Sequence, residues 1–391
     1  MKKLFFITGE LSGDIHAAKV LNELYKIIPP KDILVKAIGS VNLEKAGAEI
    51  FFDCKYLSSM GLTEVIKKLP LYVGLERELL SKLSTFLPDV VILVDFPGFN
   101  LRIAKKIRER FPNTKVVYYL PPQVWAWNEG RTKILAKYCD LVLCGLPFEE
   151  EFHKKRGVNA YYVGNPLLNE LEIFDREKVR NEFGITKEDT LVGLFPGSRA
   201  SEIYYMLPVL LQASALLYKV FPHYRFMIAQ APTISNLESE VQNGLQKHGL
   251  LNIREKIKIL PPGNNHKLLY ASDFVWLTSG TVTLEAALYE TPMILGYKSN
   301  QINYLLYLLV KRINMIGLPN IILSEKIVPE LIQNDATAQN YYQATKEWLQ
   351  VHGHLEKIKN NLKRVKEKLG SKDASRETAE RIIKLITKRS F

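Results

Sequence analysis

Cysteine is scarce in this 391-residue chain, and its three occurrences form no recognisable motif. Cys54, Cys139 and Cys144 include no C-x-x-C pair, which argues against a zinc site and against a framework of disulfides. We therefore expect three small, buried apolar side chains in a protein of a reducing compartment.

Long uninterrupted apolar segments are also missing. A membrane-spanning helix needs roughly 20 predominantly apolar residues, and the longest rival, YLLYLLV at 304–310, ends at Lys311 and Arg312. The first residues, MKKLFFITGELSGD, reach Glu10 and Asp14 too early to contain the apolar core of a signal peptide. We therefore expect a protein that is soluble or lies on a membrane surface.

Acidic residues are fewer than basic ones: the chain has 41 Asp and Glu residues and 53 Lys and Arg residues, which gives a net charge of +12. Such an excess favours an acidic partner, namely nucleic acid, an anionic membrane or a phosphorylated small molecule. The basic residues concentrate at 354–389, where they mix with glutamates at helical spacing and no aromatic residues interleave to stack bases. We therefore expect no nucleic-acid partner.

Two sets of short apolar runs alternate with helix-like segments, and a polar stretch at 163–189 without any strand pattern separates them. The runs are residues 3–8, 33–39, 90–96, 115–120, 141–146, 190–197, 224–230, 257–262, 273–280 and 292–297. Continuous apolar strands between helices are typical of parallel sheets covered on both faces. We therefore predict an α/β protein with two doubly wound, Rossmann-like domains that face a cleft, at residues 1–170 and 171–344.

Ligands of such sheets bind beyond the carboxyl ends of the strands, so the loops after the strands are the candidates for chemistry. One loop of the first domain contains Gly9 and Gly13, which permit a ligand to approach closely, and Ser12 or Asp14 can cap the following helix. The G-x-x-x-G spacing matches neither the dinucleotide fingerprint nor a P-loop. Capping is therefore the better explanation of Asp14.

Asp95 directly follows five apolar residues of another expected strand. Desolvation there would raise its pKa toward the range useful for a general base. An equally good alternative is that Asp95 satisfies turn amides ahead of Pro97 and Gly98. The next loop places Trp125 and Trp127 either in the wall of a cleft or in the core.

A turn of small residues in the second domain, Gly197, Ser198 and Arg199, precedes a helix. Backbone N–H groups, a helix start and a guanidinium together suit a phosphate group. The alternative is that Arg199 pairs with Glu202 on the surface.

A second turn of this kind, Ser279, Gly280 and Thr281, would present free N–H groups at another helix start. Glu285 lies one turn further, where it either binds the hydroxyls of a ribose or lies on the exposed face of a capped helix. Together with the first turn, these residues favour a pocket for a nucleotide sugar.

Eight motifs, in order over nearly the whole chain, resemble those of the lipid-A-disaccharide synthases, a family of inverting glycosyltransferases with the GT-B fold. They are GELSGD (9–14), VDFPGFN (94–100), PPQVWAW (121–127), LPFE (146–149), VGNPL (163–167), FPGSR (195–199), SGTVTLEAAL (279–288) and LPNII (318–322). The ordered set is specific, although no single motif is.

The resemblance implies that UDP-2,3-diacylglucosamine donates its sugar to the 6-hydroxyl of 2,3-diacylglucosamine 1-phosphate (lipid X), forming the β-1,6-linked lipid A disaccharide 1-phosphate and UDP. Asp95 matches the family position proposed for the base. The donor-binding residues that it implies are Gly197, Ser198, Arg199, Ser279, Gly280, Thr281, Glu285, Asn320 and Gln333. The acceptor-side residues are Gly9, Glu10, Ser12, Gly13 and Asp14. No D-x-D pair is placed to hold a cation, so no metal and no cofactor are expected.

Further expectations follow from the resemblance. Helices at 345–391 would return to the first domain, and the enzyme would lie on the cytoplasmic face of the inner membrane, with a homodimer left open. Basic, apolar patches that would meet lipid are Leu69, Leu71, Tyr72, Val73, Leu75 and Leu79 near Lys67, Lys68 and Arg77, and Tyr304 to Leu309 before Lys311 and Arg312. Core packing is the alternative for the first patch. Asn165 replaces a histidine found in many members, so no imidazole base is available there.

Two other functions are kept as alternatives. One is a GT-B transferase that acts on an undecaprenyl-linked acceptor, and the other is a non-catalytic sensor of nucleotide sugars.

Overall fold

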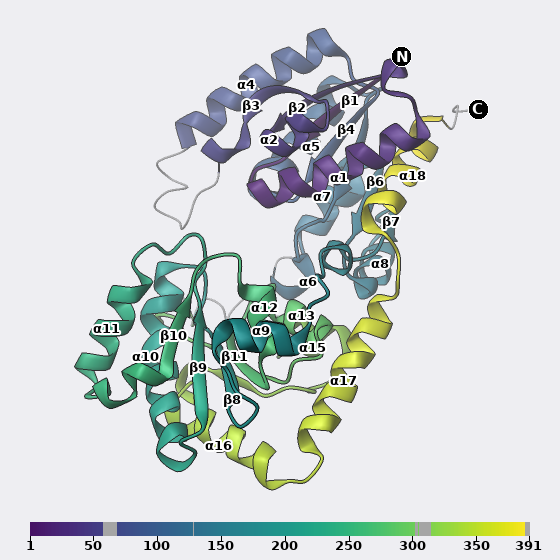
Figure 1. Ribbon diagram of the computed structural model, residues 1–391. Helices are drawn as coiled ribbons and strands as arrows, with labels where there is room; N and C mark the ends of the chain where they lie inside the picture. The colour runs from purple at the N-terminus through teal and green to yellow at the C-terminus, as the bar shows by residue number, and fades with distance from the viewer. Residues whose placement is uncertain (58–68, 128, 302–303, 305–313, 388–391) are drawn as a thin grey trace. The chain divides into compact units, whose positions relative to one another are not determined.

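The computed structural model describes residues 1–57, 69–127, 129–301, 304 and 314–387, and the chain divides into two compact units. The first unit comprises Met1–Asn169 and Leu369–Phe391, and the second comprises Glu170–Lys368. Each unit contains one parallel sheet with helices packed around it (Figure 1). The predicted α/β fold with two doubly wound sheets is therefore confirmed.

Seven parallel strands form the sheet of the first unit, in the order β3-β2-β1-β4-β5-β6-β7. They are β1 (Lys2–Ile7), β2 (Ile33–Gly39), β3 (Glu49–Asp53), β4 (Val90–Val94), β5 (Lys115–Tyr119), β6 (Leu141–Cys144) and β7 (Ala160–Tyr162). β1 and β4 are neighbours, with Leu4 beside Val90. The strand order reverses between them, so their carboxyl ends form the topological switch point at which such sheets bind ligands.

The side chains of each strand alternate between two hydrophobic clusters, so Phe5 and Leu4 point to opposite faces of the sheet. The helices α4 (Leu69–Phe86), α5 (Pro97–Arg110) and α7 (Arg131–Tyr138) supply side chains to the cluster of Phe5. The helices α1 (Leu11–Ile27), α2 (Val41–Lys45) and α18 (Ala374–Thr387) supply them to the cluster of Leu4. The apolar strands are thus covered on both sides, which leaves their ends for polar groups.

The C-terminal segment returns to the first unit, where α18 packs against α1 (Figure 1). The Tyr162 hydroxyl donates to the carbonyl of Leu369 at 2.7 Å, and the division of the chain places the return at Leu369. This corrects the expectation that the return includes all of 345–391. α16 (Ala338–Gln350) and most of α17 (His354–Leu369) belong to the second unit, because the apolar face of α16 packs against that unit's core, with Trp348 against Phe274.

Six parallel strands form the second sheet, in the order β10-β9-β8-β11-β12-β13. They are β8 (Thr190–Phe195), β9 (Tyr224–Ala229), β10 (Ile257–Leu260), β11 (Phe274–Thr278), β12 (Met293–Tyr297) and β13 (Glu330–Ile332). The surrounding helices are α9 (Arg176–Phe183), α10 (Ala200–Val220), α11 (Leu237–Lys247), α12 (Asn265–Ala271), α13 (Val282–Leu288), α15 (Leu318–Leu323), α16 and α17. β8 and β11 are neighbours, so their carboxyl ends form the second switch point.

All ten expected strands are present, whereas β3, β7 and β13 were not predicted. Each of these three lies at an edge of its sheet. None is a continuous buried run: β13 is half-buried throughout, and β3 has no buried residue. An edge strand has a neighbour on one side only, so its sequence needs no long apolar run and carries little signal.

The helix α10 is long and apolar enough to cross a membrane by length and composition. The sequence was not expected to contain such a segment. Half of its apolar window is buried inside the protein, and α10 packs against α16 and the strands of the second sheet. Its apolar character therefore serves the core of the second unit.

The lipid-facing patch expected on α4 is only partly present. Leu75 and Leu79 are buried in the cluster of Phe5, and Leu71 and Tyr72 pack against it, so core packing explains these residues. Val73 is exposed. Lys67 and Lys68 lie outside the described residues, and so does the second patch, Tyr304 to Leu309 with Lys311 and Arg312, except for Tyr304.

The three cysteines are free thiols and are buried, as expected. Burial raises the pKa of the Cys54 thiol to about 11 and that of Cys139 to about 12. Both thiols are therefore protonated and unreactive near neutral pH.

Candidate active site

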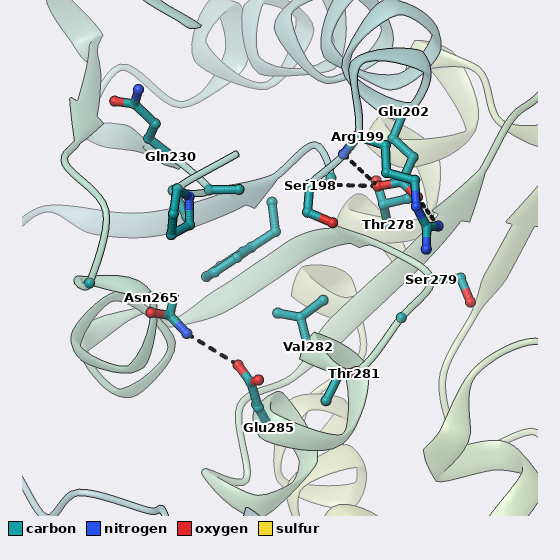
Figure 2. Close-up of a pocket in the computed structure, with 17 residues that line it drawn as sticks. Ser198, Arg199, Glu202, Gln230, Asn265, Thr278, Ser279, Thr281, Val282 and Glu285 are labelled. Carbon is teal, nitrogen blue, oxygen red and sulfur yellow. Dashed lines mark hydrogen bonds and ion pairs between the residues drawn. The ribbon is translucent and has the colours of Figure 1, made fainter. Parts of the chain in front are cut away.

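A pocket of about 510 Å³ lies at the switch point of the second sheet (Figure 2). Its lining comes from the loops that follow β8, β9, β10 and β11, which end at the same edge of the sheet. Seven of the nine predicted donor-binding residues line it: Gly197, Ser198, Arg199, Ser279, Gly280, Thr281 and Glu285. The structure thus brings both predicted turns and the carboxylate together.

The turn at Gly197 is held by an internal carboxylate. Glu202 accepts hydrogen bonds from the N–H groups of Ser198 at 2.8 Å and Arg199 at 3.2 Å, and its other oxygen pairs with the Arg199 guanidinium at 3.0 Å. Gly197 has φ of 122°, and a Cβ there would lie 2.4 Å from the Cβ of Glu202. The expectation of free phosphate-binding N–H groups in this turn is therefore wrong, because Glu202 already occupies them.

The guanidinium of Arg199 remains accessible, with 68% of its side chain exposed, whereas the Glu202 side chain is 9% exposed. Arg199 can therefore turn toward an anion in the pocket, while Glu202 continues to hold the turn. The alternative that Arg199 pairs with Glu202 is confirmed, although only the guanidinium lies on the surface and Glu202 is buried.

The turn at Gly280 keeps the binding capacity that the first turn lacks. Neither Gly280 nor Thr281 donates its N–H to any acceptor in the part of the chain that the structure describes. The hydroxyl of Thr278 is buried, and within the same part it has no hydrogen-bond partner. Three donors at the end of β11 can therefore serve an anionic group in the pocket.

Glu285 projects from α13 into the pocket and is held by two residues of α12 (Figure 2). Asn265 Nδ2 donates to it at 3.3 Å, and His266 Nε2 lies 3.7 Å from the same oxygen. Burial raises the pKa of Glu285, and His266 and Asn265 oppose that effect. With 14% of its side chain exposed, the carboxylate is not on an open helix face but at a wall of the pocket, where it can accept hydrogen bonds from hydroxyl groups.

Asn320 and Gln333, the other two predicted donor residues, do not line the pocket. Asn320 is fully buried, where its amide donates to the carbonyl of Val328 and accepts from the N–H groups of Ile327 and Val328. Gln333 exchanges two hydrogen bonds with the main chain of Ser299. Both amides hold loops around β12 and β13.

Four lining residues with polar side chains were not among the predicted ones: Glu202, Gln230, Thr278 and Asn265. Glu202 has a sequence signal, since a glutamate three residues after the residue preceding a helix is the pattern of a capping box. The other three follow or end different strands, and only the sheet order brings them together.

Asp95 lies at the switch point of the first sheet, directly after β4, and its side chain is exposed. Neighbouring protein atoms still remove water from one side of the carboxylate. This desolvation and the negative charge of Glu10 raise the pKa of Asp95. Glu10 follows the adjacent strand β1, so the two loops at this switch point meet as the sheet order requires.

The predicted acceptor-side residues have different environments. Glu10 and Ser12 are exposed, and Gly9 and Gly13 are buried. Gly9 lies under the ring of Phe96, because a Cβ there would be 2.0 Å from the Phe96 Cγ.

Asp14 is buried and does not cap its own helix. Its oxygens accept from the N–H of Ser40 at 2.6 Å and from the N–H and side chain of Asn42 at 3.0 and 2.9 Å. Asp14 therefore caps α2, a neighbour in space, and this corrects the expectation of a cap on α1.

Trp125 in α6 (Val124–Trp127) is buried, and its indole N–H donates to Glu149 of α8 (Pro147–Lys154) at 2.9 Å. The other oxygen of Glu149 accepts from the N–H of Leu146. Burial raises the pKa of Glu149 to about 7, although these donors oppose the shift. Trp125 is thus a core residue that joins the loops after β5 and β6.

Asn165 uses both ends of its amide to hold the main chain. Its Nδ2 donates to the carbonyl of Gly145 at 2.9 Å, and its Oδ1 accepts from the N–H of Leu167 at 3.0 Å. The residue is buried.

Within the described ranges, no group of three or more His, Cys, Asp or Glu side chains could hold a metal ion. The donors at the carboxyl end of β11 are neutral hydroxyl and N–H groups, and among the described residues that line the pocket Arg199 is the one lysine or arginine. These groups suit an anion.

The chain is similar to known proteins over nearly its whole length. Residues 4–386 match a family described as lipid-A-disaccharide synthetase. A lipid-A-disaccharide synthase from Geobacter metallireducens is 32% identical over 389 residues, covering 99% of this chain and 98% of that protein. One from Anaeromyxobacter sp. (strain K) is 34% identical over 381 residues, covering 97% of each.

Solved structures share the fold at low sequence identity. UDP-GlcNAc 2-epimerase from Neisseria meningitidis, bound to UDP-GlcNAc, is 15% identical with a TM-score of 0.67, covering 98% of this chain and all of that one. Sucrose-phosphate synthase from Thermosynechococcus elongatus is 12% identical with a TM-score of 0.65 and full coverage of both chains. The two-sheet GT-B fold is confirmed by these matches.

Replacement of Glu149 by glutamine is expected to remove a pH dependence of stability. The folded-state pKa of about 7 exceeds the ordinary value of 4.5, so the folded protein binds more protons between these values. The stabilisation is complete below pH 4.5 and is lost as the pH rises through 7. Between pH 5 and 8, the wild type should lose about 2 kcal/mol of unfolding free energy relative to Glu149→Gln, as measured by urea denaturation.

Glu151→Gln provides the control, because Glu151 lies on the same helix with 74% of its side chain exposed. This variant should keep the pH dependence of the wild type. Equal pH dependence in all three proteins would show that Glu149 does not titrate in this range.

Proposed function

The chain belongs to the lipid-A-disaccharide synthase family, and on this premise we propose how its residues carry out the transfer. It is a glycosyltransferase of lipid A biosynthesis. The proposed donor is UDP-2,3-diacylglucosamine, the proposed acceptor is the 6-hydroxyl of 2,3-diacylglucosamine 1-phosphate (lipid X), and the products are the β-1,6-linked disaccharide 1-phosphate and UDP.

The observation that carries this proposal is the pocket of the second unit. It joins two N–H groups and a buried hydroxyl after β11, an accessible guanidinium after β8 and a carboxylate after the first turn of α13. The donors suit a diphosphate, and Glu285 suits the two hydroxyls of a ribose. The epimerase with the same fold binds a UDP sugar, which supports placing UDP here.

In the proposed reaction, the acceptor hydroxyl attacks the anomeric carbon as the bond to the UDP oxygen breaks, so the configuration inverts in one displacement. The carboxylate of Asp95 takes the hydroxyl proton. Negative charge develops on the diphosphate, and Arg199 with the N–H groups of Gly280 and Thr281 stabilises it. The raised pKa of Asp95 makes its carboxylate a stronger base than an ordinary aspartate.

Both proposed substrates carry acyl chains, so we place the enzyme on the cytoplasmic face of the inner membrane. Four exposed apolar side chains support contact through the first unit: Leu11, Ile15, Val41 and Tyr56. Leu11 and Val41 begin the helices that follow β1 and β2, and Tyr56 follows β3. These residues therefore lie beyond the carboxyl ends of the strands, on the same side of the sheet as Asp95. The net charge of +12 favours contact with an anionic surface.

The purified protein is expected to convert the two diacylglucosamine substrates to the disaccharide 1-phosphate and UDP, detected by mass spectrometry. Binding of the donor without any disaccharide would instead indicate a sensor of nucleotide sugars. Turnover with an undecaprenyl-linked acceptor in place of lipid X would contradict the proposed acceptor.

Variants of the first unit should change kcat, whereas variants of the second unit should change the Kd of UDP. Asp95→Asn is expected to lower kcat by about 10²–10⁴-fold, because the hydroxyl loses its base, while the Kd of UDP measured by calorimetry changes less than twofold. Glu285→Ala and Arg199→Ala are each expected to raise the Kd of UDP by about tenfold or more, since each removes charged hydrogen bonds.

Glu177→Ala is the matched control for the UDP measurements, because it removes an exposed carboxylate of the same unit. An unchanged Kd in both pocket variants would exclude this pocket as the UDP site. Substantial turnover by Asp95→Asn would remove Asp95 as the base.

Membrane contact is expected to depend on the exposed apolar residues beyond the carboxyl ends of the strands of the first sheet. The double variant Leu11→Ser with Val41→Ser should bind about tenfold less to vesicles of phosphatidylethanolamine and phosphatidylglycerol in a sedimentation assay, because each change removes apolar burial. Val220→Ser is the control, since Val220 and Leu11 are both 51% exposed and Val220 lies in the second unit. Equal binding by all variants would exclude this surface.

A further inference from the structure

Two consecutive residues at the switch point of the first sheet have a left-handed backbone. Asp95 has φ of 47° and Phe96 has φ of 50°. Neither is glycine, so this conformation is strained and persists only where surrounding groups hold it. The strained backbone belongs to the proposed base, so the groups that hold this backbone can affect the rate of transfer.

The main chain of Asp95 is held on both sides. Its N–H donates to the carbonyl of Tyr119 at 3.1 Å. Its own carbonyl accepts from the Tyr118 hydroxyl at 2.7 Å and from Asn100 Nδ2 at 2.8 Å. The two donors use both lone pairs of the carbonyl oxygen, so the peptide that follows Asp95 has one orientation.

Asn100 ties this peptide to two strands. Its Nδ2 also lies 3.3 Å from the carbonyl of Val94, at the end of β4, and 3.4 Å from that of Ile7, at the end of β1. The residue is fully buried in α5. Because three carbonyl oxygens surround one nitrogen, the site requires a donor there, and a carboxylate of the same shape would be repelled.

The Phe96 side chain packs against the loop that follows β1. Its ring covers Gly9, and its centroid lies 6.0 Å from that of Tyr72 and 5.7 Å from that of Phe99. Phe96 therefore cannot relax its backbone unless the loop after β1 also moves.

We infer that Tyr118 and Asn100 are positioning residues for the glycosyl transfer. They hold the strained peptide so that the Cα–Cβ bond of Asp95, which carries the carboxylate, keeps a single direction. This inference rests on the proposed role of Asp95 as the base. A displacement of a reacting group by about 1 Å can cost 10²-fold in rate.

The test is Tyr118→Phe, which removes one hydroxyl and leaves the ring. We expect kcat to fall about tenfold, while the KM of both substrates and the Kd of UDP stay within twofold. Tyr162→Phe is the matched control, because the Tyr162 hydroxyl also donates to a main-chain carbonyl at 2.7 Å, but on β7, three strands from β4. It should cost similar stability and leave kcat unchanged.

Asn100→Ser should lower kcat further than Tyr118→Phe, because it releases three carbonyl groups. If this variant does not fold, the Tyr118 variant decides the question alone. Equal kcat in Tyr118→Phe and Tyr162→Phe would overturn the inference, as would a change in KM without one in kcat.

The Asp95→Asn background separates this inference from the proposed function. If Tyr118 acts through the base, Tyr118→Phe should have no further effect on the residual turnover of Asp95→Asn. An additional tenfold loss in that background would show that Tyr118 acts elsewhere. An active Asp95→Asn enzyme would contradict the proposed base itself.

Discussion

The burial of parallel strands on both faces is the constraint on which the rest of this structure depends. Strands such as β4, with five buried residues, offer no place for a polar group along their length. Polar chemistry is therefore confined to the strand ends, and neighbouring carboxyl ends bring together residues that are far apart in the chain. At the second switch point, Arg199 and Glu285 reach one pocket in this way.

Each switch point combines an accessible group with buried groups that hold it. In the first unit, Asp95 is exposed, whereas Asn100 and Tyr118 below it are buried. In the second unit, the guanidinium of Arg199 is exposed, whereas Glu202 is buried. A strained or anion-binding loop needs such support, because a flexible loop would lose conformational entropy each time a substrate bound.

Buried carboxylates have a structural role in several loops. Asp14 accepts the N–H groups at the start of α2, Glu202 accepts those of the Gly197 turn, and Glu149 joins Trp125 to the loop after β6. Each carboxylate satisfies donors that would otherwise be buried without partners, which is costly. In sequence, however, an acidic residue near glycine or serine in a loop looks the same whether it binds a ligand or a backbone.

The sequence by itself determined the fold and the two turns and the carboxylate of the second unit's pocket, because these depend on local signals. Continuous apolar runs specify buried strands, and a small-residue turn before a helix marks a place where backbone N–H groups need an acceptor, which is Glu202 at the Gly197 turn and is open at the Gly280 turn. The edge strands β3, β7 and β13 escaped prediction because they are short and none of them is a continuous buried run. Only the tertiary structure decided the partners of other polar groups: it brought Asp14 to α2, and Asn320 and Gln333 to the loops around them. The physical reason is that a donor or acceptor forms a hydrogen bond with the partner that the packed chain brings within about 3 Å. That partner can be distant in sequence.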